Sequence, residues 1–206
     1  MYIPAWFREE NILKLHDFIR QFSFAALVTQ REGSPFATHL PFLLDRERGE
    51  RGTLQAHMAR ANPQWQEFEA GQEALIIFQG PHAYISPAWY KTQPSVPTWN
   101  YAVVHAYGIP RIVDELTLRA IVEATVQTFE SEREQPWNMD LPEEYLQKML
   151  RGIVGFEIEI TRLEGKFKMS QNRSEADRKQ VIEALLASDH AGDRDTAHWM
   201  KKTIDE

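Results

Sequence analysis

The sequence comprises 206 residues, with 23 lysines and arginines against 30 aspartates and glutamates, a net charge of −7 and no cysteine. This balance disfavours a surface dominated by nucleic-acid contacts, and without cysteine there can be no disulfide, thiolate chemistry or cysteine-ligated zinc. No apolar run approaches the roughly 20 residues that a membrane-spanning helix needs, and the first residues lack the pattern of a secretory signal. We therefore expect a cytoplasmic protein of about one domain, with no membrane contact.

The first half of the chain is predicted to consist mainly of short strands. Apolar residues at helical spacing predict one helix over 9–22, before the first strand. Asn62 is a favourable N-cap, Pro63 a favourable first helical residue, and Gly71 a favourable residue after the end of that short helix. The predicted strands are 24–30, 35–44, 53–57, 74–78 and 83–86, the last two separated by Gly80-Pro81.

The second half is predicted to be richer in helices. Asp114 and Ser174 each precede a helical pattern and stand at N-cap positions. Residues 152–163 alternate polar and apolar side chains, as a strand with one buried face does. The other expected elements are a loop over 91–97, a strand region over 99–113 and helices over 141–150 and 193–203.

The order of these elements predicts the fold class. Six or seven short strands, joined mostly by turns rather than helices, favour a small antiparallel barrel over a doubly wound sheet. We expect a β-rich α+β fold with an antiparallel split β-barrel over 1–173 and peripheral helices. Residues 174–206 are expected to form a C-terminal helical extension packed on the barrel.

The stretch from His57 to Trp65 is the first candidate site. A strand here leads into a capped helix start, and Arg60 stands two residues before the Asn62 cap. Free N–H groups at a helix start attract anions, and a guanidinium can bind phosphate through two parallel hydrogen bonds. The alternative is a capped surface helix with a solvated arginine.

A second candidate site lies at 166–173, before the Ser174 cap. It carries Lys166, Lys168 and Arg173 and no acidic residue. The side chains of Gln171 and Asn172 both donate and accept, which suits the edge of a heterocycle. The alternative is a solvated basic loop.

Aromatic residues around a proline-rich loop form the third candidate region, over 86–90 and 96–101. Such density suits a flat ligand or a subunit interface, and hydrophobic packing is the alternative. There is no G-x-G-x-x-G, phosphate-binding P-loop or H-E-x-x-H motif, so the sequence predicts no classical dinucleotide, ATP or metal site. Histidines in or beside the predicted strands leave a metal or haem site open as an alternative.

Several short motifs resemble the PaiB-type family of FMN-binding negative transcriptional regulators with a split-barrel fold. They run in the family's order from the first residue to about Arg178, and Gln180 and Ala184 depart from it where glycines are expected. The motifs are Met1–Pro4, His39–Phe42, His57–Pro63, Phe78–Pro87, Val96–Tyr101, Val104-His105 and Lys168–Arg173.

The resemblance implies a homodimer that holds FMN between two barrels. It also implies that the flavin is bound by strand-end side chains of two segments. The residues expected to bind the cofactor are His57, Arg60, Asn62, Trp99, Asn100, Lys168, Ser170, Gln171, Asn172 and Arg173.

Three functions follow from the resemblance and the candidate residues. The first is an FMN-binding regulator; the second is an FMN-dependent oxidoreductase, although no catalytic acid or base stands out. The third is a haem-binding split-barrel protein. Direct DNA binding stays open, because residues 174–206 carry more acidic than basic residues and no helix-turn-helix is evident.

Overall fold

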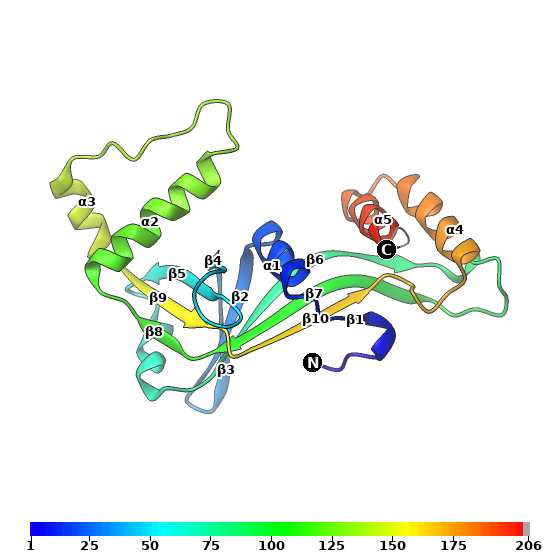
Figure 1. Cartoon of the computed structure of the whole chain (residues 1–206), viewed down its shortest axis with the longest axis horizontal. Helices are drawn as coiled ribbons and strands as arrows, with labels where there is room; N and C mark the ends of the chain where they lie inside the picture. Colours follow the sequence, from blue (N-terminus) through cyan, green and yellow to red (C-terminus); the bar gives the residue numbers. More distant parts are fainter. Residues whose placement is uncertain (204–206) are drawn as a thin grey trace. The chain divides into compact units, whose positions relative to one another are not determined.

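The computed structural model describes residues 1–203, and their contacts divide the chain into two compact units. The first unit contains Met1–Phe18, Gln79–His105 and the residues from Glu164 onward. The second contains Ile19–Phe78 and Ala106–Leu163. Three long strands contribute residues to both units, and each unit is described by itself (Figure 1).

The second unit is built on antiparallel strands with two α-helices and one 3-10 helix. Strand β5 pairs with β9 along its length, from Thr53 opposite Glu159 to Ala59 opposite Ile153. A four-stranded sheet has the order β4-β5-β9-β8, and β2 lies between β3 and β6. The strands are β2 (Phe24–Arg31), β3 (Ser34–Pro41), β4 (Leu43–Asp45), β5 (Thr53–Ala59), β6 (Ala74–Ile85), β8 (Pro110–Ile112) and β9 (Ile153–Glu159), and the helices are η2 (Pro63–Ala70), α2 (Glu115–Glu130) and α3 (Glu143–Leu150).

Phenylalanines fill the core of this unit. Phe42 lies edge-on to Phe78, with ring centroids 5.9 Å apart, and Phe68 packs on Phe156 at 5.1 Å. A smaller cluster of Leu118, Leu146 and Leu150 joins α2 and α3 to β9.

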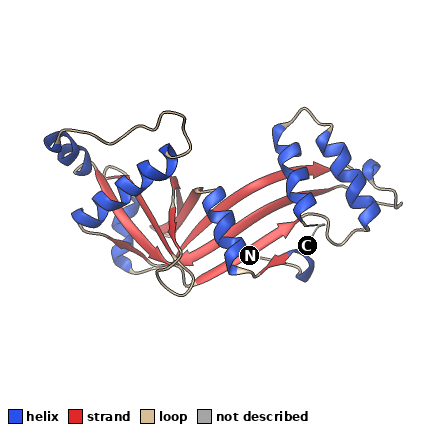
Figure 2. Ribbon diagram, turned by 45° about the horizontal axis from the view of Figure 1, so that its top comes forward, coloured by secondary structure: helices blue, strands red, loops and turns tan. Residues whose placement is uncertain are grey.

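The first unit is organised around the strand order β1-β10-β7-β6. Its aromatic core brings together Phe18, Phe167 and Trp199, with centroid distances of 5.2–5.3 Å. Helices α4 and α5 lie side by side in this unit (Figure 2). Its elements are η1 (Ala5–Phe7), β1 (Arg8–Glu9), α1 (Ile12–Gln21, which crosses into the second unit), η3 (Pro87–Trp89), β7 (Thr98–Gly108), β10 (Arg162–Lys168), α4 (Glu175–Leu186) and α5 (Ala191–Lys202).

The predicted helix starts are confirmed because capping is a local interaction. The carboxylate of Asp114 accepts from Thr117 N at 2.8 Å, and the hydroxyl of Ser174 accepts from Asp177 N at 3.2 Å. Gly71 follows η2 in the left-handed conformation, with φ +65°. The division into a barrel over 1–173 and an extension over 174–206 stays a prediction.

Four predicted strand regions have wrong boundaries. The strands expected at 74–78 and 83–86 are one continuous β6, because Gly80-Pro81 is accommodated inside an extended strand. The region 152–163 is not one strand: β9 ends at Glu159 and β10 begins at Arg162. The predicted strands 35–44 and 99–113 each divide into two, giving β3 and β4 and then β7 and β8.

The antiparallel pairing and the peripheral helices confirm the predicted fold class. Within residues 1–203, no helix is both long and apolar enough to cross a membrane.

Candidate functional site

The junction between β5 and η2 has the cap that the sequence predicts. Asn62 Oδ1 accepts from Gln64 N at 3.0 Å, and Asn62 Nδ2 donates to Thr38 Oγ1 at 2.9 Å. However, η2 is a 3-10 helix rather than an α-helix. Its peptide groups are less well aligned, so its N-terminus is a weaker anion site than the sequence suggests.

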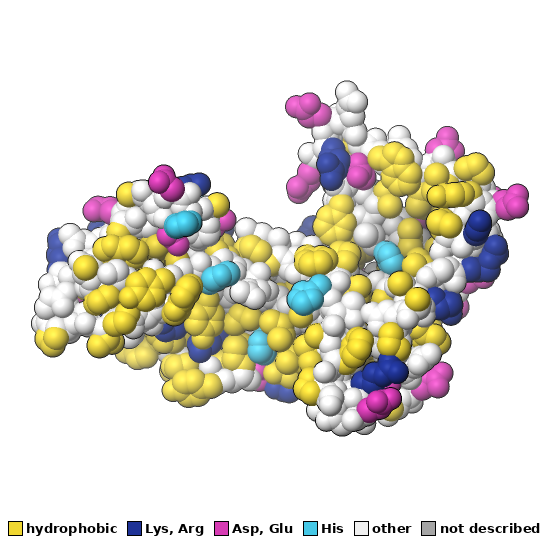
Figure 3. Space-filling view, turned by 180° about the vertical axis from the view of Figure 1, so that it is seen from behind, with side chains coloured by type: hydrophobic (Ala, Val, Ile, Leu, Met, Phe, Trp, Pro, Cys, Tyr) yellow, Lys and Arg dark blue, Asp and Glu magenta, His cyan; other side chains and the backbone are white. Residues whose placement is uncertain are grey.

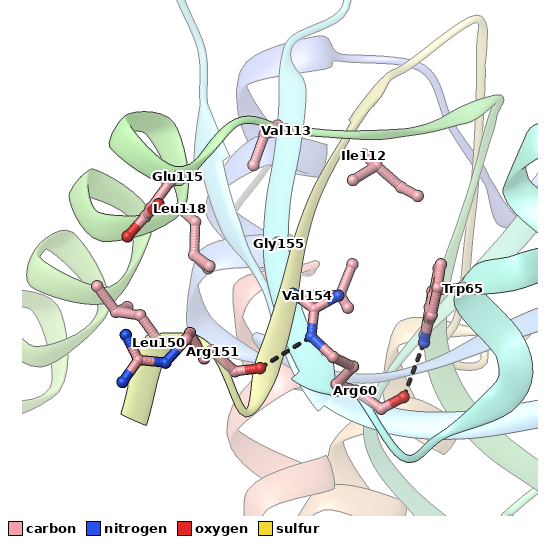
Figure 4. Close-up of a pocket in the computed structure, with 10 residues that line it drawn as sticks. All are labelled: Arg60, Trp65, Ile112, Val113, Glu115, Leu118, Leu150, Arg151, Val154 and Gly155. Atoms are coloured by element: carbon pink, nitrogen blue, oxygen red, sulfur yellow. Dashed lines mark hydrogen bonds between the residues drawn. The ribbon is translucent and has the colours of Figure 1, made fainter. Parts of the chain in front are cut away.

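Arg60 is fixed at this junction by backbone carbonyls of the α3–β9 connection. Its Nε donates to Arg151 O at 2.8 Å and its Nη2 to Ile153 O at 2.9 Å, while the indole of Trp65 donates to Arg60 O at 2.9 Å (Figure 4). No carboxylate within residues 1–203 forms an ion pair with this guanidinium. Arg60 is therefore a cation of fixed orientation whose hydrogen-bond acceptors are neutral backbone carbonyls.

A cavity of about 160 Å³ lies beside Arg60. Figure 4 shows Trp65 on one side of it and the first turn of α2 on the other. Most of its wall is apolar, and its charged side chains are two arginines and one glutamate. The lining residues are Arg60, Trp65, Ile112, Val113, Glu115, Leu118, Leu150, Arg151, Val154 and Gly155.

His57 lies on β5 opposite Gly155. Its side chain does not line this cavity. Burial lowers the pKa of the His57 imidazole below its ordinary value of 6.5. Its neutral form is therefore favoured at pH 7.

The first unit contains a cluster of three cations, Lys166, Lys168 and Arg173, which we call the cation cluster. Lys166 and Lys168 are two residues apart on β10 and share one face of the strand. Burial lowers the pKa of Lys168, and the charges of Lys166 and Arg173 lower it further. No acidic group among the described residues forms an ion pair with any of the three.

Neutral groups surround these cations. Lys168 Nζ donates to Thr98 Oγ1 and to the carbonyl of Trp99. Lys166 is only 8% exposed, and its ammonium donates to Tyr2 O at 3.1 Å. A nearly buried lysine without a carboxylate is unusual and marks a site of excess positive charge.

Tyr90 is part of the same surroundings. The guanidinium of Arg173 lies 4.5 Å from the centre of its ring. The Tyr90 hydroxyl is buried and has no hydrogen-bond partner among the described residues. A buried hydroxyl is normally paired, so this donor is available to a ligand oxygen.

The turn between β10 and α4 is held by buried hydrogen bonds. Asn100 is fully buried, and its Nδ2 donates to Ser170 Oγ at 2.9 Å. Ser170 has a φ of +63°, a conformation that needs such support in a residue other than glycine. Gln171 Oε1 accepts from Met169 N at 2.7 Å, and Gln171 Nε2 donates to Phe167 O. These three side chains shape the turn.

Two predicted residues of this region are exposed instead. Trp99 is 53% exposed and lies edge-on to Tyr84, with ring centroids 5.9 Å apart. Asn172 is also exposed. The structure thus places Trp99, Asn100 and Lys168–Arg173 in the first unit and His57, Arg60 and Asn62 in the second. Their contact with a flavin stays a prediction.

The residues expected to bind the cofactor do not include Lys166, Tyr90 or Thr98, although all three lie in the second or third candidate region. Lys166 could have been found, because 162–168 alternate charged residues with Leu163, Gly165 and Phe167, as a strand does. Tyr90 and Thr98 reach the cluster only through tertiary packing.

The family of the chain follows from comparison with known proteins. Residues 1–162 match the family model described as "Putative FMN-binding domain". The chain belongs to this family. It is also 38% identical over 205 residues to "Protease synthase and sporulation protein PAI 2" of Bacillus subtilis, covering 99% of this chain and 98% of that protein. The predicted membership of the PaiB-type family is confirmed, and FMN is the cofactor of this family.

Solved structures show the same fold at low sequence identity. A FAD- and haem-binding protein from Mycobacterium smegmatis has a TM-score of 0.63 and 14% identity, over 82% of this chain and 78% of that chain. The flavocytochrome Anf3 from Azotobacter vinelandii has a TM-score of 0.62 and 15% identity, over 86% of this chain and 78% of that chain. These likenesses confirm the split-barrel fold.

Proposed function

We propose that the cation cluster binds the phosphate of FMN, within a homodimer that acts as a cytoplasmic regulator. The observation that carries this proposal is a group of three cations without carboxylate partners, next to the unpaired hydroxyl of Tyr90. A phosphate monoester carries close to two negative charges at neutral pH and three acceptor oxygens. A phosphate therefore complements both the positive charge of the cation cluster and the unpaired hydroxyl donor of Tyr90.

The electrostatics of Lys168 support the same assignment. Its pKa is lowered because burial and two like charges disfavour the ammonium. A bound phosphate reverses that balance, because an anion beside the ammonium favours the charged form. Hydrogen bonds to charged groups are each worth about 1.5–3 kcal/mol, so one lysine contributes roughly tenfold or more to affinity.

The other predicted residues have supporting roles in this proposal. Asn100, Ser170 and Gln171 hold the turn that carries Arg173, while the exposed Trp99 and Asn172 are available to the flavin. His57, Arg60 and Asn62 are proposed as polar contacts of a second segment. Arg60 and Asn62 are also hydrogen-bonded to protein atoms, which fixes the orientation of both side chains.

Exposed apolar surface supports the homodimer. Tyr84, Val96 and Trp99 of the first unit are 46–68% exposed. Figure 3 shows hydrophobic side chains gathered over the strands of this unit. Exposed apolar patches of this kind mark interaction surfaces, and aromatic residues are enriched in them.

The regulatory role rests on the family and on the name of the Bacillus relative, which refers to sporulation. Helices α4 and α5 belong to a segment, 174–206, with eight acidic and five basic residues. This charge disfavours direct contact of the segment with DNA, so we propose that regulation is indirect.

The test is to titrate the protein with FMN and with riboflavin, which lacks the phosphate. We expect FMN to bind at least tenfold more tightly, and Lys168→Met to remove most of that preference. Lys179→Met is the matched control, because Lys179 is an exposed lysine of the same unit that pairs with Glu175. Its FMN preference should stay that of the unmodified protein.

Two further readouts make the test specific. The preference for FMN should decline as the pH rises toward 10.5, the ordinary pKa of lysine, because Lys168 loses its proton below that value. Tyr90→Phe should weaken FMN more than riboflavin. Equal affinity for the two flavins, or an unchanged preference in Lys168→Met, would refute the proposed phosphate site.

A further inference from the structure

We propose that the cavity beside Arg60 binds a small monocarboxylate with an apolar body. This binding site lies outside the cation cluster and shares only Arg60 with the proposed flavin contacts, and it gives the protein a second ligand. The size of the cavity, its apolar wall and its three charged lining residues support this assignment (Figure 4).

The size of the cavity suits a small organic acid. Its volume of about 160 Å³ is close to that of apolar protein cavities, about 150 Å³, that hold a benzene molecule. Pockets for larger ligands occupy about 300–1,000 Å³. The ligand is therefore a molecule about as large as a branched short-chain acid.

The apolar wall selects a ligand with a hydrocarbon body. Leu118, Leu150 and Val154 are 3–5% exposed and form its inner surface. Gly155 lets Leu118 and Val113 pack directly on β9, because a Cβ there would come within 2.8 Å of Leu118 Cδ1 and 2.9 Å of Val113 Cγ2. Burial of a hydrocarbon group against such a wall is favourable by the area removed from water.

Arg60 supplies the partner for the carboxylate. Two of its five N–H donors are used on the carbonyls of Arg151 and Ile153, which fix the plane of the guanidinium. The remaining donors have no acidic partner among the described residues. Because this cation is already oriented, an incoming carboxylate loses little affinity to side-chain ordering.

Glu115 explains why the ligand carries only one negative charge. Glu115 lines the cavity, and its carboxylate forms no ion pair or hydrogen bond within the described part of the chain. A second carboxylate on the ligand would be repelled there, whereas one carboxylate balances the net charge of Arg60, Arg151 and Glu115. The site thus discriminates monocarboxylates from dicarboxylates.

The test compares 4-methylpentanoate with its neutral amide, 4-methylpentanamide, by calorimetric titration of the full chain. We expect saturable binding of the acid and at least tenfold weaker binding of the amide. Arg60→Gln should weaken the acid roughly tenfold or more, and Glu115→Gln should tighten it about twofold to fivefold. Arg111→Gln is the matched control, since it removes an exposed arginine of β8 that does not line the cavity.

Two further variants distinguish a specific loss of binding from a loss caused by misfolding. Arg60→Lys keeps the charge but not the planar fork, and it should bind the acid with intermediate affinity. Ile112→Trp narrows the cavity from an exposed edge strand and should abolish binding. Equal binding of acid and amide, unchanged binding in both Arg60 variants, or no saturation in the unmodified protein would overturn the proposal.

The same variants separate this inference from the phosphate site. Glu115→Gln and Ile112→Trp should leave the FMN preference over riboflavin intact, because neither residue belongs to the cation cluster. Lys168→Met should leave binding of 4-methylpentanoate intact. Loss of either ligand alone therefore identifies which proposal has failed.

Discussion

Two junctions in this protein have the same sequence pattern and different electrostatics. In each, a strand ends near basic residues and a capped helix begins a few residues later: Asn62 caps η2 and Ser174 caps α4. Arg60 at the first junction is hydrogen-bonded to backbone carbonyls. Lys168 at the second is surrounded by neutral groups and two further cations, which lower its pKa.

The comparison shows that a helix cap can be predicted from neighbouring residues in the sequence. The ligand that a nearby basic side chain suits cannot be predicted in this way. Neutral carbonyls orient Arg60 beside a cavity that suits a small acid. Excess charge around Lys168 suits a phosphate. Substitution of the side chains that build each junction tests how far this difference depends on them.

The largest effect is expected from the buried hydrogen bond that holds the second junction. Asn100→Ala removes the partner of the Ser170 hydroxyl, which is 3% exposed, and should lower the free energy of unfolding by about 1–3 kcal/mol. Denaturant titration measures this loss. It should also weaken FMN relative to riboflavin, because the turn carrying Arg173 loses its support.

Two variants check that cause. Asn172→Ala changes an exposed residue of the same turn and should alter stability by less than about 0.5 kcal/mol. The double variant Asn100→Ala with Ser170→Ala should be less destabilised than the sum of the single variants, because the unpaired hydroxyl is gone. Full additivity would contradict the role assigned to this pair.

Removal of the two helix caps should lower the free energy of unfolding by less than Asn100→Ala does, and by different amounts at the two junctions. Ser174→Ala should cost about 0.5–1 kcal/mol, as removal of an N-cap hydroxyl does. Asn62→Ala should cost more, about 1–2 kcal/mol, because it also loses the hydrogen bond to Thr38. Thermal or chemical unfolding of both variants measures the difference.

Asn62→Asp separates the two contributions at the first junction. Aspartate keeps the oxygen that accepts from Gln64 N but has no amide to donate to Thr38. Its stability should therefore lie between those of the unmodified protein and Asn62→Ala. If Asn62→Asp is as unstable as Asn62→Ala, the cap contributes nothing measurable.

Local signals account for the part of the fold that the sequence predicts. The caps at Asn62, Asp114 and Ser174 depend on residues two or three positions away, and all three are found. The interruption predicted at Gly80-Pro81 fails because an extended strand can include a proline where its missing donor is not needed. Pairing with neighbouring strands decides where a strand ends. A local sequence pattern carries no information on that pairing.

The candidate site shows the same limit. Lys168 and Arg173 stand out in the sequence as bases without nearby acids. The unpaired hydroxyl of Tyr90 and the approach of Tyr2 to Lys166 depend on residues more than 80 positions away. The carbonyls that bind Arg60 are likewise about 90 positions away. Such partners follow from the tertiary fold alone.

The smallest expected effect is on the pH dependence of the free energy of unfolding, through His57 at the first junction. Burial lowers the folded-state pKa of His57 below 6.5, so the unfolded chain binds more protons in the pH range just below that value. Stability is therefore complete above pH 6.5 and is lost as the pH falls toward the folded-state pKa. His57→Gln should remove this part of the pH dependence. Unfolding measured at pH 7.5 and in steps below 6.5 should show a smaller loss for the variant. Parallel curves for the two proteins would mean that the imidazole is solvated, and that the junction around Arg60 is more open than the structure shows.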